Sequence, residues 1–206
     1  MPTAPRRALL VIDVQNEYFT GKLPITYPPV ATSLPHITLA MDTATAHGLP
    51  VIVVQHGTPA GAPVFAIDSP GWALHPDVAA RPADHRVHKT QASVFAGTDL
   101  ADWLTAHRID TLTVAGYMTH NCNASTILQA AHAGWQVEFL ADASGSLAYE
   151  NGAGKASAEE IHRVFSVVFH SNFAAVTDTA AWIKAVTDGV ALEKDNIVLS
   201  NQRARQ

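Results

Sequence analysis

The sequence contains only one cysteine, Cys122, among 206 residues. A lone cysteine cannot form a disulfide within the chain, so we expect a reducing environment and a cytoplasmic location. Two arginines precede the apolar stretch 8–14, but Asp13 interrupts that stretch, and a signal peptide would need a longer one followed by a cleavage site. Apolar runs of membrane-spanning length are also missing. These absences predict a protein that is neither secreted nor embedded in a membrane.

Positive charge is scarce as well. The 13 lysines and arginines stand against 18 aspartates and glutamates, which gives a net charge of −5. The sequence has no basic run of the kind that binds nucleic acid or an anionic membrane, so we expect neither partner and favour a small-molecule substrate. The length and a hydrophobic content of 48% suit one domain with a full core. We expect this domain over residues 1–187 and a polar C-terminal tail over residues 188–206.

Short runs rich in valine, leucine and isoleucine alternate with helical patterns. Ser33 is predicted as the N-cap of one helix that ends at Gly48, and Ser157 with Glu160 has the spacing of a capping box. The alternation predicts a doubly wound, Rossmann-like α/β fold, with a mostly parallel six-stranded sheet in the order 3-2-1-4-5-6 and helices on both faces. The predicted strands span residues 8–14, 50–55, 85–89, 111–116, 135–142 and 173–176, and further helices begin near residues 98 and 123 and span 179–186.

Three reactive side chains follow three of these strands. Asp13 ends the first strand, Lys89 ends the third, and Cys122 follows the fourth after a short loop. Because ligands bind at the carboxyl ends of strands in such sheets, we expect the three groups to form one site. A helix start and a nearby ammonium group are expected to lower the pKa of the thiol. Asp13 could take the thiol proton and return it to a leaving amine, and backbone N–H groups of the 117–122 loop could bind an oxyanion.

Each of these residues also has an ordinary structural interpretation. A free cysteine is most often a small buried apolar side chain. An aspartate at the end of a strand often forms a turn, and a lysine there is often simply solvated. The combination favours a catalytic site, because three independent coincidences would otherwise have to share one edge of the sheet.

The segments around these residues resemble a known family. LLVIDVQNEYF, HKTQASVFAGTDL and VAGYMTHNC are similar to the three signature segments of the isochorismatase-like cysteine hydrolases, and the likeness extends over about residues 7–187. The resemblance implies that Asp13 is the general base and acid, Lys89 its electrostatic partner and Cys122 the nucleophile. It also implies a cis peptide bond between Tyr117 and Met118, and an oxyanion hole made by the backbone N–H groups of Met118 and Cys122.

The resemblance further implies a cysteine-dependent hydrolase that cleaves a C–N bond of a small amide, lactam or ureido substrate through a thioester. It implies no cofactor and a homo-oligomer, either a dimer or a tetramer. Two alternatives stay open: a streptothricin-type lactam hydrolase in particular, or a non-catalytic or redox-sensing member of the fold. A redox role is less favoured because the chain has no second cysteine to resolve a sulfenic acid.

Several departures from the family pattern narrow this prediction. The cysteine argues against the vinyl ether cleavage of true isochorismatases, which lack it. Nicotinamidases have an Asp-x-His metal cluster after the second strand, where this chain has Gln55 and His56. His85 and His88 cannot share a metal ion on a strand, because residues three apart face opposite sides. We therefore expect no metal site. Asn123 follows the cysteine, where an apolar residue is more usual.

The walls of the site and a rival mechanism are also suggested by the sequence. A long loop rich in proline and glycine follows the second strand, and loops of this length are usually functional or disordered. We expect Asn16, Phe19, Trp72 and Tyr117 to line the substrate pocket. His120 lies two residues before the cysteine and could instead form a Cys–His dyad with it.

Overall fold

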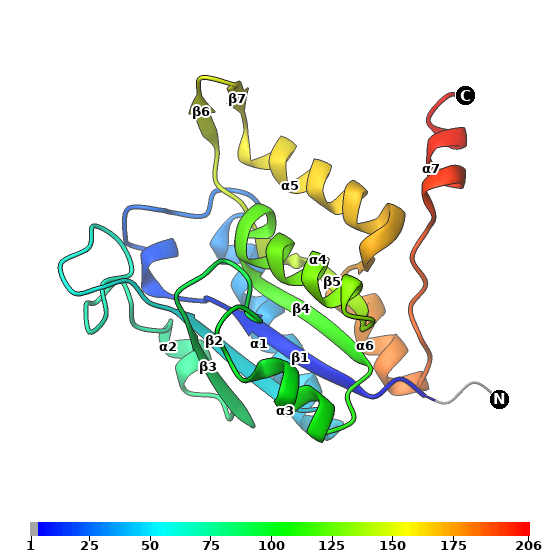
Figure 1. The fold of residues 1–206 in the computed structure, drawn as a ribbon, viewed down its shortest axis with the longest axis horizontal. Coiled ribbons are helices and arrows are strands. Elements are labelled where there is room, and N and C mark those ends of the chain that lie inside the picture. Colours follow the sequence, from blue (N-terminus) through cyan, green and yellow to red (C-terminus); the bar gives the residue numbers. More distant parts are fainter. Residues whose placement is uncertain (1–3) are drawn as a thin grey trace.

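The computed structural model describes residues 4–206, which are organised around a central sheet of six parallel strands (Figure 1). The strands pair in the order β3-β2-β1-β4-β5-β8. The predicted doubly wound α/β fold is therefore confirmed, with β8 as the sixth strand of the predicted order. The strands are β1 (Arg7–Ile12), β2 (Val51–His56), β3 (His85–Lys89), β4 (Thr111–Tyr117), β5 (Gln136–Gly145) and β8 (Ala175–Thr177).

Helices cover both faces of this sheet. Apolar side chains of α1 and α6 pack on the face that contains Leu9 and Val11, and those of α3 and α4 pack on the face that contains Leu10 and Ile12. Alternate residues of a strand point to opposite faces, so a strand covered on both sides is apolar throughout. Burial of each such side chain contributes about 1.5–3 kcal/mol. The helices are α1 (Val30–Ala46), α2 (Pro76–Ala79), α3 (Leu100–Ala106), α4 (Ala124–His132), α5 (Ala158–Val168), α6 (Thr179–Asp188) and α7 (Ile197–Arg203).

The first helix begins earlier than the sequence predicts. Pro29 is the N-cap of α1, so the prediction of Ser33 as N-cap is wrong. Ser33 lies in the first turn, where it is buried and its hydroxyl shares a 2.8 Å hydrogen bond with the hydroxyl of Tyr117. A serine is a common N-cap, but here its hydroxyl has a tertiary partner instead. The helix ends before Gly48 as predicted, and Gly48 adopts φ 67°.

Short elements were not indicated by any sequence pattern. A hairpin of β6 (Tyr149–Asn151) and β7 (Gly154–Ala156) forms a separate two-stranded sheet after β5. One π turn, Thr119–Asn123, precedes α4, and another, Phe169–Phe173, follows α5. The second turn explains why the last strand begins at residue 175 and not at residue 173. Elements of three to five residues are too short to show a recognisable period.

The predicted tail folds back along the body of the domain. Helix α6 ends at Gly189, which adopts φ 65°. Arg7 Nη2 donates to the Val190 carbonyl at 2.6 Å, and the Asp195 N–H donates to the His170 carbonyl at 2.9 Å. Helix α7 follows. The division into a domain and a tail stays a prediction, and residues 1–3 of the predicted domain lie outside the described residues. Within residues 4–206, no helix has both the length and the apolar character that a membrane span requires.

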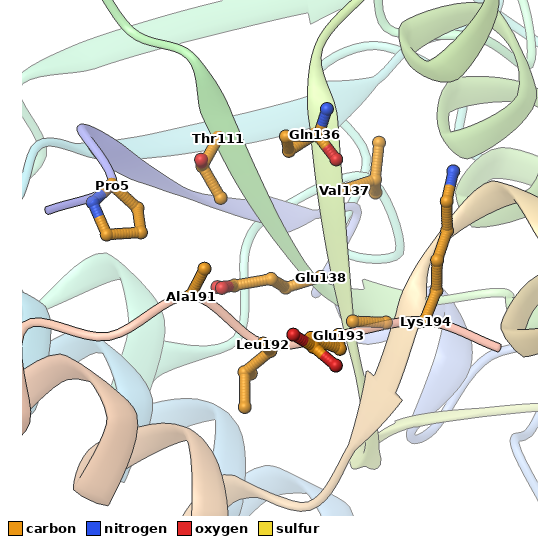
Figure 2. Close-up of a pocket in the computed structure, with 10 residues that line it drawn as sticks. Pro5, Thr111, Gln136, Val137, Glu138, Ala191, Leu192, Glu193 and Lys194 are labelled. Atoms are coloured by element: carbon orange, nitrogen blue, oxygen red, sulfur yellow. The ribbon is translucent and has the colours of Figure 1, made fainter. Parts of the chain in front are cut away.

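A buried polar network lies at the amino ends of β1, β4 and β5. Arg7 Nη2 is 2.8 Å from Glu138 Oε1, and Thr113 and Trp182 donate to Glu138 Oε2 at 2.8 and 3.1 Å. Figure 2 shows Glu138 beside a cavity of about 360 Å³ that the tail residues 191–194 also line. This cavity lies at the opposite edge of the sheet from the strand ends that carry Asp13 and Lys89.

Candidate active site

The carboxyl ends of β1, β3 and β4 bring the three predicted reactive side chains together. Asp13 directly follows β1 and adopts φ 51°, in the left-handed region that aspartate tolerates better than most residues. Its N–H donates to the Val54 carbonyl at 3.0 Å, which joins the turn to β2. The side chain of Asp13 is fully buried. A buried carboxylate on a strained turn at the centre of the sheet is typical of a functional position.

Lys89 is the last residue of β3, and its ammonium group connects the other two side chains. Its Nζ lies 2.7 Å from Asp13 Oδ2 and donates to Cys122 Sγ at 3.3 Å. It also donates to the Gln91 carbonyl at 3.2 Å and lies 3.5 Å from His56 Nδ1. Burial alone would lower the pKa of Lys89, but the Asp13 carboxylate and the hydrogen bonds to Asp13 and Cys122 outweigh burial and raise it. The lysine is therefore an ammonium ion between a carboxylate and a sulfur atom.

Cys122 lies in the π turn between β4 and α4. The turn begins where β4 approaches β1 closely: Gly116 has φ 99°, and a Cβ atom there would lie 2.1 Å from the Ile12 carbonyl oxygen. This contact requires glycine. Asn123 donates from Nδ2 to the Gly116 carbonyl at 2.8 Å, which fixes the turn on the end of the strand. Single π turns of this kind are frequent at functional sites.

The backbone of this turn leaves N–H groups available beside the sulfur. The peptide bond between Tyr117 and Met118 is cis. The Met118 carbonyl accepts from the N–H groups of Asn121 and Asn123, both at 3.1 Å, but not from the N–H of Cys122. Among residues 4–206, no hydrogen bond joins the Met118 N–H to an acceptor. The Met118 N–H is thus available for the oxyanion hole that the family resemblance implies, and the part of the Cys122 N–H in it stays a prediction.

The thiol itself differs from the sequence-based expectation. Cys122 is only 5% exposed, and this burial raises its pKa; the Asp13 carboxylate raises it further, while the Lys89 ammonium opposes both. The prediction of a lowered pKa is therefore wrong for the free protein. The physical reason is that α4 begins only at Ala124, while the sulfur lies among apolar side chains and beside a negative charge. The resting thiol is neutral, so ionisation requires a base during the reaction.

His120 has partners other than the sulfur. Its Nδ1 lies 3.1 Å from Ser146 Oγ, and its ring packs against Tyr149 and Phe165 at centroid distances of 5.0 and 6.2 Å. Burial lowers the pKa of His120 to about 4, so the ring is neutral. In the described part of the chain, no hydrogen bond joins His120 to Cys122. These contacts favour a structural role for His120 over a Cys–His dyad.

A second buried histidine makes the site sensitive to acid. His162 of α5 lies with its Nδ1 2.8 Å from Thr119 Oγ1 in the π turn, and burial lowers its pKa to about 4. Unfolded histidine has a pKa near 6.5, so the unfolded state binds more protons between these two values. Stability is therefore lost as the pH falls through this window. We expect urea unfolding to show that His162 accounts for about 1–2 kcal/mol of lost stability between about pH 7 and about pH 5.

The variant His162→Gln tests this expectation, because it keeps a polar side chain but cannot take up a proton in this range. Its stability, compared at the same two pH values, should fall less than that of the unchanged protein. An equal fall in both proteins would show that other groups cause the loss.

The predicted pocket residues differ in what their side chains contact. Tyr117 is fully buried and directly precedes the cis peptide bond. The ring of Phe19 packs against the ring of Tyr117 at a centroid distance of 5.9 Å. Asn16 instead holds the loop together, because its Nδ2 donates to the Pro70 carbonyl at 3.2 Å. That Asn16, Phe19 and Tyr117 contact substrate stays a prediction.

Trp72 lies near Lys89, and two buried glutamines hold its backbone. Gln15 and Gln55 donate from Nε2 to the Trp72 carbonyl at 2.7 and 2.9 Å. Gln55 therefore has a structural role in this loop. Over residues 4–206, no group of three or more histidine, cysteine, aspartate or glutamate side chains could hold a metal ion. Trp72 lines a cavity of about 360 Å³ together with Gly57, Ile67, His88, Lys89 and Thr90.

Sequence analysis missed the role of Tyr18. Its ring is buried and packs against the rings of Phe65 and Tyr117 at centroid distances of 5.1 and 5.6 Å. Burial raises the pKa of Tyr18, and the Asp13 carboxylate raises it further. Its position five residues after Asp13 was the available signal, but aromatic residues are most often core.

The contribution of the Asn123 side chain to the stability of the π turn can be tested by mutation. Asn123→Ala removes the donor to the buried Gly116 carbonyl, and an unsatisfied buried carbonyl costs about 1–3 kcal/mol. We expect urea unfolding to show a loss of this size. Asn121→Ala is the matched control, because Asn121 is exposed and lies in the same turn. Equal losses in the two variants would contradict the role given to Asn123.

Comparisons with known proteins agree with this geometry. Residues 7–181 match the isochorismatase domain family. A streptothricin hydrolase of Streptomyces noursei is 34% identical over 137 residues, which are 66% of this chain and 49% of that protein. An N-carbamoylsarcosine amidase of an Arthrobacter species is 28% identical over 148 residues, which are 64% of this chain and 56% of that protein. This chain thus spans about half the length of both relatives.

The structural likeness extends over nearly the whole chain. The crystal structure of an isochorismatase-type protein from Burkholderia xenovorans LB400 superimposes with a TM-score of 0.98 at 62% sequence identity and covers 98% of both chains. The family match and this likeness agree with the six-stranded parallel sheet and the helices around it. The chain therefore belongs to the isochorismatase-like cysteine hydrolase superfamily and, like the members of that superfamily, is a hydrolase.

Proposed function

We propose that this protein hydrolyses a C–N bond of a small amide, lactam or ureido compound through a thioester on Cys122. The observation that carries this proposal is the position of Lys89 Nζ, 2.7 Å from Asp13 Oδ2 and 3.3 Å from Cys122 Sγ in a buried site. A carboxylate, an ammonium group and a thiol in contact supply the base, the electrostatic partner and the nucleophile that covalent amide hydrolysis needs.

The first half of the reaction forms the acyl-enzyme. Asp13 takes the thiol proton as Cys122 Sγ attacks the carbonyl carbon, and the carbonyl electron pair moves onto oxygen. The N–H groups of Met118 and Cys122 bind this oxyanion, and the Lys89 ammonium stabilises the added negative charge. When the intermediate collapses, the C–N bond breaks, and Asp13 gives its proton to the leaving nitrogen. An amine or ammonia departs, and the acyl group stays on sulfur.

The second half releases the acid. A water molecule attacks the thioester carbonyl, and Asp13 takes one of its protons. The new oxyanion accepts hydrogen bonds from the same two N–H groups. Collapse breaks the C–S bond, and the thiolate recovers the proton from Asp13. One amide and one water thus become one acid and one amine, and the three side chains return to their starting state.

The raised pKa of the thiol supports this order of events. A neutral resting thiol cannot attack an amide without a base, and the Asp13 carboxylate, paired with the Lys89 ammonium at 2.7 Å, is the base that the site offers. The same neutral thiol speaks against a redox sensor, since oxidation requires the thiolate. The amidase among the relatives supports a C–N substrate in general. A cytoplasmic location and a homo-oligomer stay predictions.

A substrate panel tests the proposal directly. Primary amides, ureido acids and cyclic lactams are incubated with the protein, and released ammonia or amine is measured. We expect turnover of at least one class, and Cys122→Ala should abolish it. A preference for lactams would favour the streptothricin-type alternative. Complete absence of turnover in every class would favour a non-catalytic member of the fold.

A further inference from the structure

The β6–β7 hairpin has no part in the chemistry proposed above, although it follows the strand next to the catalytic turn. It forms a sheet of its own, and its residues are exposed except for Ala156, which is half-buried. Figure 1 shows the hairpin projecting from the body of the domain, between the end of β5 and the start of α5. A two-stranded hairpin is only marginally stable by itself, so contacts with the rest of the domain must help to hold it in place.

One side chain of the hairpin points back toward the catalytic turn. The ring of Tyr149 meets the ring of His120 edge-on, with centroids 5.0 Å apart and planes at 87°. His120 lies two residues before Cys122 in the π turn. The ring of Phe165 from α5 lies 6.2 Å from the ring of His120. These contacts hold Tyr149 at the rim of the turn, yet 44% of its surface remains exposed to solvent.

The contact with His120 places the ring of Tyr149 at the exposed side of the turn that carries Cys122. Tyr18 lies on the inner side, where its buried ring packs against the ring of Tyr117. Partial burial raises the pKa of Tyr149, so its phenol is neutral.

We propose that Tyr149 is a substrate-contacting residue that forms the outer wall of the site and selects substrates with a planar, conjugated group next to the scissile amide. A half-exposed aromatic ring held by an edge contact can stack on such a group, and aromatic contacts of this kind strengthen binding by about three- to tenfold beyond the area that they bury. The proposal rests on the proposed function for its reaction, but its geometry concerns only access to Cys122.

The single cysteine allows a test that does not depend on turnover. Iodoacetamide and N-phenyliodoacetamide both alkylate a thiol: the S–C bond forms, iodide leaves, and the thiol proton is lost to a base. Rate constants are measured at mildly alkaline pH by mass spectrometry for the unchanged protein and for Tyr149→Ala, Tyr149→Phe and the control Glu150→Gln. Glu150 lies in the same hairpin and forms an exposed ion pair with Lys155.

We expect Tyr149→Ala to lower the rate constant for N-phenyliodoacetamide about tenfold and to change that for iodoacetamide less than about twofold. Tyr149→Phe and Glu150→Gln should behave like the unchanged protein. Equal changes with both reagents would overturn the proposal, because they would show that Tyr149 only supports the turn. Unchanged rates for the phenyl reagent would overturn it too. If Tyr149→Ala slows alkylation by N-phenyliodoacetamide selectively but the protein hydrolyses no amide, the proposed function is wrong while the role of Tyr149 in contacting aromatic groups is supported.

Discussion

Replacement of Asp13 by asparagine is expected to lower kcat/KM by about a thousandfold or more, while Cys122 becomes easier to alkylate. Asparagine has nearly the same shape, but it can neither take the thiol proton nor protonate the leaving nitrogen. Turnover of the best substrate from the panel measures the first effect. The loss should appear in kcat, because the base acts in the chemical step and not in binding.

In the same Asp13→Asn variant, the reactivity of the Cys122 thiol is expected to increase while turnover decreases. The Asp13 carboxylate raises the pKa of Cys122, and the Lys89 ammonium lowers it. In Asp13→Asn only the lysine charge remains, so the thiol pKa should fall and the pH profile of iodoacetamide alkylation should move to lower pH. A structural collapse of the site would also expose the thiol and speed its alkylation, but it would not move the pH profile to lower pH, so the pH profile is the decisive measurement. Slower alkylation in this variant would contradict the arrangement of charges described above.

His120→Asn separates this mechanism from the dyad. If Asp13 is the base, this variant should keep turnover within about tenfold of the unchanged protein, since His120 contacts Ser146 and Tyr149 but not the sulfur. Loss of turnover in His120→Asn, with turnover retained in Asp13→Asn, would establish the dyad instead.

Replacement of Lys89 by methionine is expected to destabilise the protein by about 3–5 kcal/mol and to abolish turnover. Methionine fills a similar volume but leaves the fully buried Asp13 carboxylate without its partner at 2.7 Å. An unpaired buried charge is strongly unfavourable, so urea unfolding should show the loss at neutral pH.

The double variant Asp13→Asn/Lys89→Met provides the control. It removes both charges, so its loss of stability should be clearly smaller than the sum of the two single losses. Additive losses would show that the two side chains contribute independently and that the ion pair is not the source of the effect. Turnover should stay absent in the double variant in either case.

The fold class and the position of the reactive groups could be predicted because they depend on local patterns. Uninterrupted apolar strands alternating with helices require a covered parallel sheet, and residues at the carboxyl ends of such strands share one edge. Asp13 and Lys89 were therefore assigned to one site without knowledge of any contact. Gly48 likewise marked the end of α1, because a positive φ favours glycine.

Other features depended on neighbours that are distant in sequence. Serine is a common N-cap residue, yet the hydroxyl of Ser33 shares a hydrogen bond with the hydroxyl of Tyr117, 84 residues away. Gln55 is the next-to-last residue of β2, yet its side chain holds the backbone of Trp72, 17 residues away. Tyr149 lies on a hairpin too short to have a period, so its contact with His120 had no signal in the sequence.

By itself, the sequence determined that this chain forms a doubly wound sheet and that a carboxylate, an amine and a thiol end three of its segments. Whether the thiol is ionised was decided only by the tertiary structure. Local sequence suggested a helix start that would favour the thiolate, but the folded chain surrounds Cys122 with apolar side chains and the Asp13 charge. Desolvation depends on what the whole chain packs around an atom, and no local pattern contains that information.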